Sequence, residues 1–194
     1  MLDEIKSMIK EERPLTWVFT GDSITHGVVW TLGLRDYVEL FEERLRNELW
    51  RTHDFVVNTA VNGWRTGDLK ENIERHILDI NPDVVSIMMG MNDASTGRDG
   101  LEGFEQNYRF IIDKIQERTS ARILLHTPNP TMPSDTVMRR EALPAFAAKI
   151  RTLADEYHCG VIDHYEYWLK AWEDYAIRTN MWMADSIHPS EYGH

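Results

Sequence analysis

The sequence has a single cysteine, Cys159, among its 194 residues, so no disulfide can form within the chain. A lone thiol is typical of reducing compartments, and we expect Cys159 to be a small buried residue. The first fourteen residues, MLDEIKSMIKEERP, lack the apolar core of a secretory signal peptide. Together these absences lead us to expect a cytoplasmic protein.

Long apolar runs and positive charge are also scarce. No run approaches the roughly 18 apolar residues of a membrane-spanning helix. Lys and Arg total 21 against 32 Asp and Glu, which gives a formal net charge of -11. Because an acidic surface repels nucleic acids and anionic membranes, we expect no nucleic-acid partner and no membrane span. We expect a small molecule as the partner, and the sequence leaves a homo-oligomer open.

What is present is the pattern of one α/β domain over residues 1–194. Hydrophobic residues make up 42% of the chain, which is enough for a full core. Short β-rich runs alternate with longer amphipathic ones. The expected strands are 17–20, 55–58, 84–89, 122–126 and 160–163, and the expected helices are 34–50, 69–80, 104–115, 144–157 and 165–175. This alternation predicts a doubly wound parallel sheet of five strands.

Two of these helices carry explicit start signals. Asp36 and Glu39 form a capping box near the start of the first. Pro144 is expected in the first turn of the fourth, where its missing N–H costs nothing.

In such sheets, ligands bind beyond the carboxyl ends of the strands. Four loops lie there: 21–27, 59–67, 90–97 and 127–133. The first lacks the glycine patterns G-x-G-x-x-G and G-x-x-x-x-G-K, which weakens a nucleotide- or flavin-binding interpretation.

The first loop, in VFTGDSITHG, places Asp22, Ser23 and His26 within five residues. A serine just past a strand can act as a nucleophile only if a base takes its proton. His26 would need an unusual bend, and an orienting carboxylate of its own, to serve. The apparent local triad is therefore the weaker grouping.

The segment DSIHP offers better chemistry, because Asp185 precedes His188 by three residues. Residues at this spacing share a face of a turn. Asp185 could accept the Nδ1–H of His188 and leave Nε2 to take a proton from Ser23.

An oxyanion would need preorganised donors. Gly63, in a turn after the second strand, can present a bare N–H. The side-chain amide of Asn92 in GMND is a second candidate, and the N–H of Ser23 is a third.

Four blocks, GDSITHG, AVNGWRTGDL, GMND and DSIHP, resemble the signature blocks of the SGNH hydrolases, also called GDSL esterases and lipases. The resemblance runs from Val18 to His194. It implies a flavodoxin-like three-layer α/β/α sandwich without a metal or organic cofactor. It also implies the site roles: Ser23 as nucleophile and oxyanion donor, Gly63 and Asn92 as further donors, Asp185 as orienting acid and His188 as base. Family members usually continue with a helix behind the histidine loop, which is either trimmed from this sequence or absent.

The sequence therefore predicts a serine esterase that removes a short acyl group, acetyl above all, from a carbohydrate. The alternatives are a lysophospholipase or thioesterase of the same family, and a non-catalytic small-molecule-binding domain. Some side chains in or near these loops are candidates to line the substrate, although ordinary packing would explain each alone. They are Asp22, His26, Trp64 and Trp182, with Trp30 and Arg65 nearby.

Overall fold

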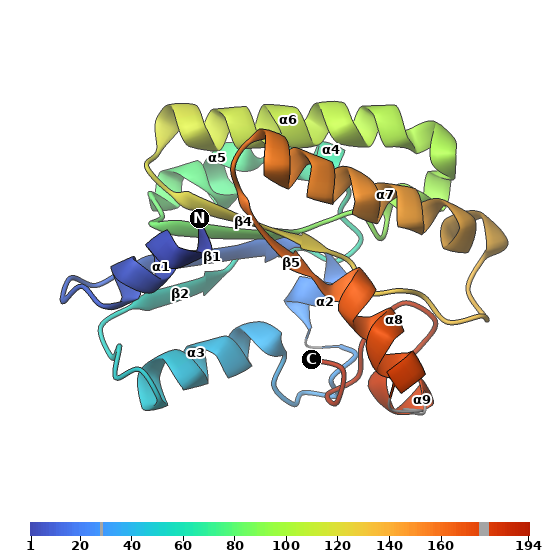
Figure 1. Ribbon diagram of the computed structural model, residues 1–194, viewed down its shortest axis with the longest axis horizontal. Helices are drawn as coiled ribbons and strands as arrows, with labels where there is room; N and C mark the ends of the chain where they lie inside the picture. The colour runs from blue at the N-terminus through green and yellow to red at the C-terminus, as the bar shows by residue number, and fades with distance from the viewer. Residues whose placement is uncertain (28, 175–178) are drawn as a thin grey trace.

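The computed structural model describes residues 1–27, 29–174 and 179–194. Its centre is a parallel sheet with the strand order β2-β1-β3-β4-β5 (Figure 1). The strands are β1 (Thr16–Gly21), β2 (Phe55–Asn58), β3 (Val84–Met88), β4 (Arg122–Thr127) and β5 (Gly160–Asp163). The predicted doubly wound sheet is confirmed, because all four neighbouring pairs are parallel.

Helices cover both faces of this sheet and give the predicted α/β/α layers (Figure 1). The α-helices are α1 (Leu2–Ile9), α2 (Ser23–His26), α3 (Tyr37–Asn47), α4 (Thr66–Glu71), α5 (Ile73–His76), α6 (Leu101–Arg118), α7 (Val137–Glu156), α8 (His164–Asp174) and α9 (Thr179–Trp182). The short 3₁₀ helices are η1 (Leu78–Ile80), η2 (Asp93–Thr96) and η3 (Arg98–Gly100). In the part of the chain that the structure describes, no helix is both long and apolar enough to cross a bilayer.

The two faces of the sheet have separate cores. The larger core packs α4 to α7 against β3 and β4, and includes Tyr108 and Phe146. The smaller core packs α1 and α3 against β1, and includes Trp17 and Phe19. Cys159, expected to be buried, is half-buried beside the larger core.

Two helix predictions were wrong in their bounds. The predicted helix 69–80 is divided into α4, α5 and η1, because Ile77 has a non-helical backbone (φ -136°) between the last two. The predicted helix 144–157 begins earlier, at Val137, with Pro144 inside it. Proline removes one backbone hydrogen bond at this position. The helix nevertheless includes the turn before Pro144, because Ala142 and Leu143 in that turn are buried in the core. Burial therefore outweighs the local cost of Pro144.

The other predicted strands and helices lie close to their predicted bounds, whereas the short helices α1, α2 and α9 were not predicted. The capping box at α3 is confirmed, since the Asp36 carboxylate accepts from the amides of Val38 and Glu39, and the Glu39 side chain accepts from the amide of Asp36. The expected end of the last helix at Tyr175 lies outside the described residues.

A close approach at Gly27 joins α2 to α3. Gly27 has φ +75°, and a Cβ placed on it would lie 2.3 Å from the Cβ of Asp36. Only glycine fits this position, because both the backbone angle and the space exclude a side chain. The contact fixes the path of the chain as it leaves the end of β1.

We predict that Gly27→Ala destabilises the protein more than two matched glycine substitutions. Gly33→Ala meets the same left-handed region (φ +80°) but has open space, and Gly103→Ala in α6 meets neither obstacle. We expect a loss of about 1–2 kcal/mol for Gly33→Ala, a larger loss for Gly27→Ala, and a gain of about 0.5–1 kcal/mol for Gly103→Ala. Urea unfolding of the three variants measures these differences. Equal stability of Gly27→Ala and Gly33→Ala would contradict the packing against Asp36.

Candidate active site

Ser23 lies where β1 ends and α2 begins, at the carboxyl edge of the sheet (Figure 1). Asp22 is the N-cap of this short helix, because its carboxylate accepts from the amide of Ile24 at 3.0 Å. The cap places the next residue on the first turn, with its side chain 5% exposed. The C-terminal segment returns to the same edge and brings His188 to Ser23.

Three side chains form a continuous hydrogen-bonded chain. The Oγ of Ser23 lies 2.8 Å from the Nε2 of His188. The Nδ1 of His188 lies 2.7 Å from the Oδ2 of Asp185. The predicted grouping of these three residues is thus present in the geometry, although 165 positions separate the serine from the histidine.

The loop that carries His188 is held by its own backbone. The other carboxylate oxygen of Asp185 accepts from the amides of Ile187 and His188, both at 2.8 Å. Met183 and Pro189 form an antiparallel bridge, which brings the two ends of the loop together. The carboxylate therefore orients both the backbone and the imidazole.

A second loop, which follows β4, supports this segment from the side. The Nδ2 of Asn129, a buried residue, donates to the carbonyl of Ile187 at 3.1 Å. The amide of Met132 donates to the carbonyl of Ser186 at 2.8 Å. Sequence reasoning missed this support. The placement of Asn129 after the fourth strand was the available signal.

The charges of the three groups suit proton transfer. Partial burial raises the pKa of Asp185, but hydrogen bonds from two amides and from His188 outweigh it and hold that pKa below its usual value. Burial lowers the pKa of His188, while the carboxylate of Asp185 opposes the change. At neutral pH the pair is therefore a carboxylate and a neutral imidazole, with a free lone pair at Nε2.

The local grouping of Asp22, Ser23 and His26 is not assembled. The hydroxyl of Ser23 bonds to His188, and the Nδ1 of His26 is buried without a hydrogen-bond partner among the described residues. Burial raises the pKa of Asp22 to about 7, and the contact of its carboxylate with Ile24 is structural.

The loops after β2 and β3 are bonded to each other at the same edge. The Nδ2 of Asn92 donates to the carbonyl of Trp64 at 3.0 Å. The carboxylate of Asp93 accepts from both the amide and the hydroxyl of Thr66. Asp93 therefore joins these two loops. Gly63, in the loop after β2, has φ +78°, a conformation that favours glycine.

The aromatic side chains near these loops differ in what they contact. Trp64 packs on His76, with ring centroids 4.6 Å apart, and Trp182 packs edge-on against Trp168. Trp30 instead lies flat against His188. Trp30 is thus the tryptophan that touches the hydrogen-bonded chain directly.

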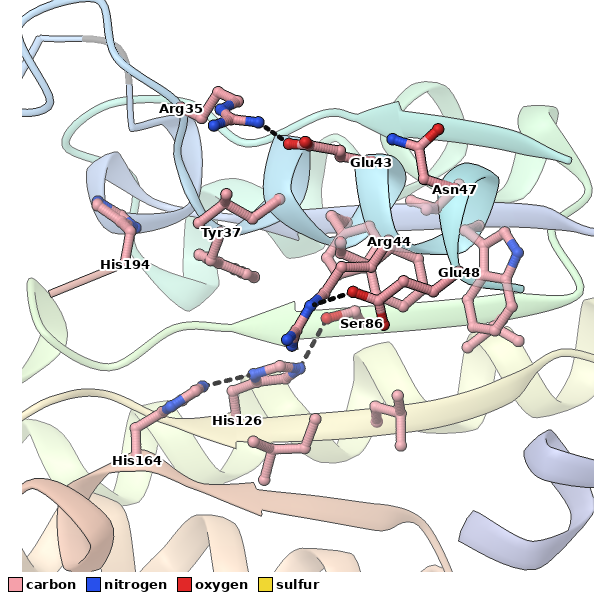
Figure 2. Close-up of a pocket in the computed structure, with 18 residues that line it drawn as sticks. Arg35, Tyr37, Glu43, Arg44, Asn47, Glu48, Ser86, His126, His164 and His194 are labelled. Atoms are coloured by element: carbon pink, nitrogen blue, oxygen red, sulfur yellow. Dashed lines mark hydrogen bonds and ion pairs between the residues drawn. The ribbon is translucent and has the colours of Figure 1, made fainter. Parts of the chain in front are cut away.

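A second serine–histidine pair lies elsewhere, in a cavity of about 660 Å³ between α3 and the sheet. Figure 2 shows Ser86 bonded to His126 (2.7 Å), which is bonded in turn to His164 (3.0 Å). Burial lowers the pKa of His126 well below its usual value. This pair has a second imidazole where Ser23–His188 has a carboxylate, and neither Ser23 nor Asp185 lines the cavity.

Within the described residues, no group of three or more His, Cys, Asp or Glu side chains is arranged to hold a metal ion.

Solved structures with this fold include esterases. An acetyl xylan esterase is 25% identical, with a TM-score of 0.78 over 92% of this chain and 93% of that one. A GDSL-like lipase, described as putative, from Parabacteroides merdae has a TM-score of 0.83 at 21% identity, over 95% and 92% of the two chains. A catalytic mutant of an acetylxylan esterase from Geobacillus stearothermophilus has a TM-score of 0.78 at 23% identity, over 95% and 91%.

Two comparisons of the sequence give matches. An uncharacterized protein of Mycoplasma pneumoniae is 34% identical over 127 residues, which are 65% of this chain but only 14% of that relative. The model of the GDSL-like Lipase/Acylhydrolase family matches residues 19–194, which include all four sequence blocks. The predicted family is confirmed: the chain belongs to the GDSL-like lipases and acylhydrolases.

Proposed function

We propose that this protein is a serine esterase that hydrolyses short acyl esters through an acyl-enzyme. The observation that carries the proposal is the hydrogen-bonded chain from Ser23 through His188 to Asp185. A serine hydroxyl bonded to a neutral imidazole, itself oriented by a carboxylate, is the arrangement that activates a nucleophile for acyl transfer.

In the first half of the reaction, the Oγ of Ser23 bonds to the ester carbonyl carbon, and its proton passes to the Nε2 of His188. The carbonyl π electrons move to oxygen and form the tetrahedral oxyanion. When that oxygen re-forms the carbonyl, the bond to the alcohol breaks, and the imidazolium gives its proton to the leaving oxygen. Water then attacks the acyl-enzyme through the same groups and releases the acid.

We assign the oxyanion to three donors: the amides of Ser23 and Gly63 and the side chain of Asn92. Two observations support this assignment. Neither amide bonds to an acceptor within the ranges that the structure describes. Asn92 uses one N–H on the carbonyl of Trp64, which orients the amide and leaves its second N–H free for a ligand.

An acetylated carbohydrate is the substrate that we propose. The support comes from the acetylxylan esterases among the structural neighbours. The chain also has no long apolar segment to cover a fatty acyl chain. The net charge of -11 favours neutral substrates over anionic ones.

We predict that the parent protein hydrolyses 4-nitrophenyl acetate and that Ser23→Ala lowers kcat/KM by about 10³-fold or more. The matched control is Ser86→Ala, which removes the hydroxyl of the other serine–histidine pair and should keep most of the activity. Initial rates of the three proteins provide the comparison. An active Ser23→Ala, or a Ser86→Ala that is equally impaired, would reject Ser23 as the nucleophile.

Esters from acetyl to octanoyl, together with acetylated sugars and lysophospholipids, extend the same assay to the substrate class. Acetyl esters should give the highest kcat/KM. A preference for octanoyl esters or lysophospholipids would favour a lysophospholipase, and inactivity on every ester would contradict the esterase proposal.

A second prediction separates the two histidines nearest to Ser23 in sequence and in space. His188→Ala should lower kcat by about 10³-fold or more, because the hydroxyl then has no base. His26→Ala should keep much of the parental kcat, since His26 has no bond to Ser23. Steady-state kinetics measure both, and the reverse ranking would overturn the assignment of the base.

A further inference from the structure

The indole of Trp30 lies flat on the imidazole of His188. Their ring centroids are 3.5 Å apart and their planes differ by 13°. Trp30 belongs to the segment between α2 and α3, far from His188 in sequence. Trp30 lies outside the four sequence blocks, and the proposed reaction does not use its contact with His188.

The segment that carries Trp30 is anchored at Gly27. The amides of Trp30 and of Thr31, which is buried, donate to the carbonyl of Gly27 at 3.1 and 3.3 Å. Gly27 in turn packs against Asp36, the N-cap of α3. These contacts hold the turn that places the indole against His188.

The edges of the imidazole are already occupied. Its Nε2 faces Ser23 and its Nδ1 faces Asp185. These two hydrogen bonds lie in the plane of the ring and resist rotation within that plane. Trp30 covers a face of the ring, so it resists tilting out of the plane.

The contact also changes in strength during the reaction. The face of an indole is negative, so it attracts a positively charged imidazolium more strongly than a neutral imidazole. His188 is neutral before Ser23 attacks and positively charged in the transition state. An interaction that strengthens only in the transition state raises kcat rather than substrate affinity.

Other charged or titratable groups also bear on His188. The carboxylate of Asp185 favours the imidazolium, whereas the guanidinium of Arg139 on α7 disfavours it. Burial first, and the neighbouring His188 second, lower the pKa of His194 to about 4. Trp30 differs from these groups because it contacts the face of the His188 ring.

We propose that Trp30 is a positioning residue for His188, which keeps the imidazole in the plane of its two hydrogen bonds and stabilises the imidazolium formed during turnover. The inference rests on the proposed esterase function.

The experiment compares Trp30→Leu with Trp30→Phe. Leucine still shields the imidazole from water but has no aromatic face, whereas phenylalanine keeps one. Trp50→Leu and Trp50→Phe are matched controls, since Trp50 is 81% exposed beyond the end of α3, near the opposite edge of the sheet. Kinetics of 4-nitrophenyl acetate hydrolysis across pH, and an NMR titration of the His188 imidazole, are the readouts.

Trp30→Leu should lower kcat by about 3- to 30-fold with little change in KM. The acid limb of kcat/KM and the NMR titration should both move to lower pH by about 0.5–1.5 pH units, because the protonated imidazole loses a favourable contact. Trp30→Phe should recover most of both effects, and the Trp50 variants should match the parent.

Several results would overturn this role. Parental kcat and pH profile in Trp30→Leu would do so, as would equal losses in Trp30→Leu and Trp30→Phe without a change in pH profile. A raised KM at parental kcat would place Trp30 in the substrate wall instead. An inactive parent protein would contradict the esterase proposal, and the NMR titration would still decide: an unchanged imidazole titration in Trp30→Leu rejects the contact.

Discussion

The two hydrogen bonds of His188 are the interaction on which the account depends. They join Ser23, at the end of the first strand, to Asp185, near the end of the chain. A parallel sheet makes this possible, because every strand ends at the same edge and the loops beyond it share one surface. The fold therefore supplies proximity, and the local bonds of Asp185 to its own loop supply orientation.

The same edge is built from mutual support between loops. Asn129 and Met132 tie the loop after β4 to the histidine loop, Asn92 ties the loop after β3 to the loop after β2, and Trp30 rests on His188 itself. His188 and Asn92 are thus each fixed by a neighbour from another element, whereas Asp185 is held by bonds within its own loop. Such preorganisation lowers the reorganisation that the reaction would otherwise require.

The strands and the Ser23–His188–Asp185 grouping could be predicted, because each depends on local signals: apolar runs that end at polar loops, and an acid three residues before a histidine. Features that depend on tertiary packing could not be predicted from the sequence. Pro144 lies inside α7 because burial of its neighbours outweighs a lost hydrogen bond, and Asp93 bonds to Thr66 across two loops. The stack of Trp30 on His188 depends on the turn at Gly27, whose close approach to Asp36 no spacing rule reveals.

Among the residues that the structure describes, two serine–histidine hydrogen bonds have nearly equal lengths, Ser23–His188 at 2.8 Å and Ser86–His126 at 2.7 Å. We propose that only Ser23 is reactive. A fluorophosphonate, which forms a covalent bond with activated serines, distinguishes the two serines when the labelled peptides are mapped by mass spectrometry. We expect one adduct per chain, on Ser23, and the loss of that adduct in His188→Ala. An adduct on Ser86, or on no serine at all, would contradict the proposal.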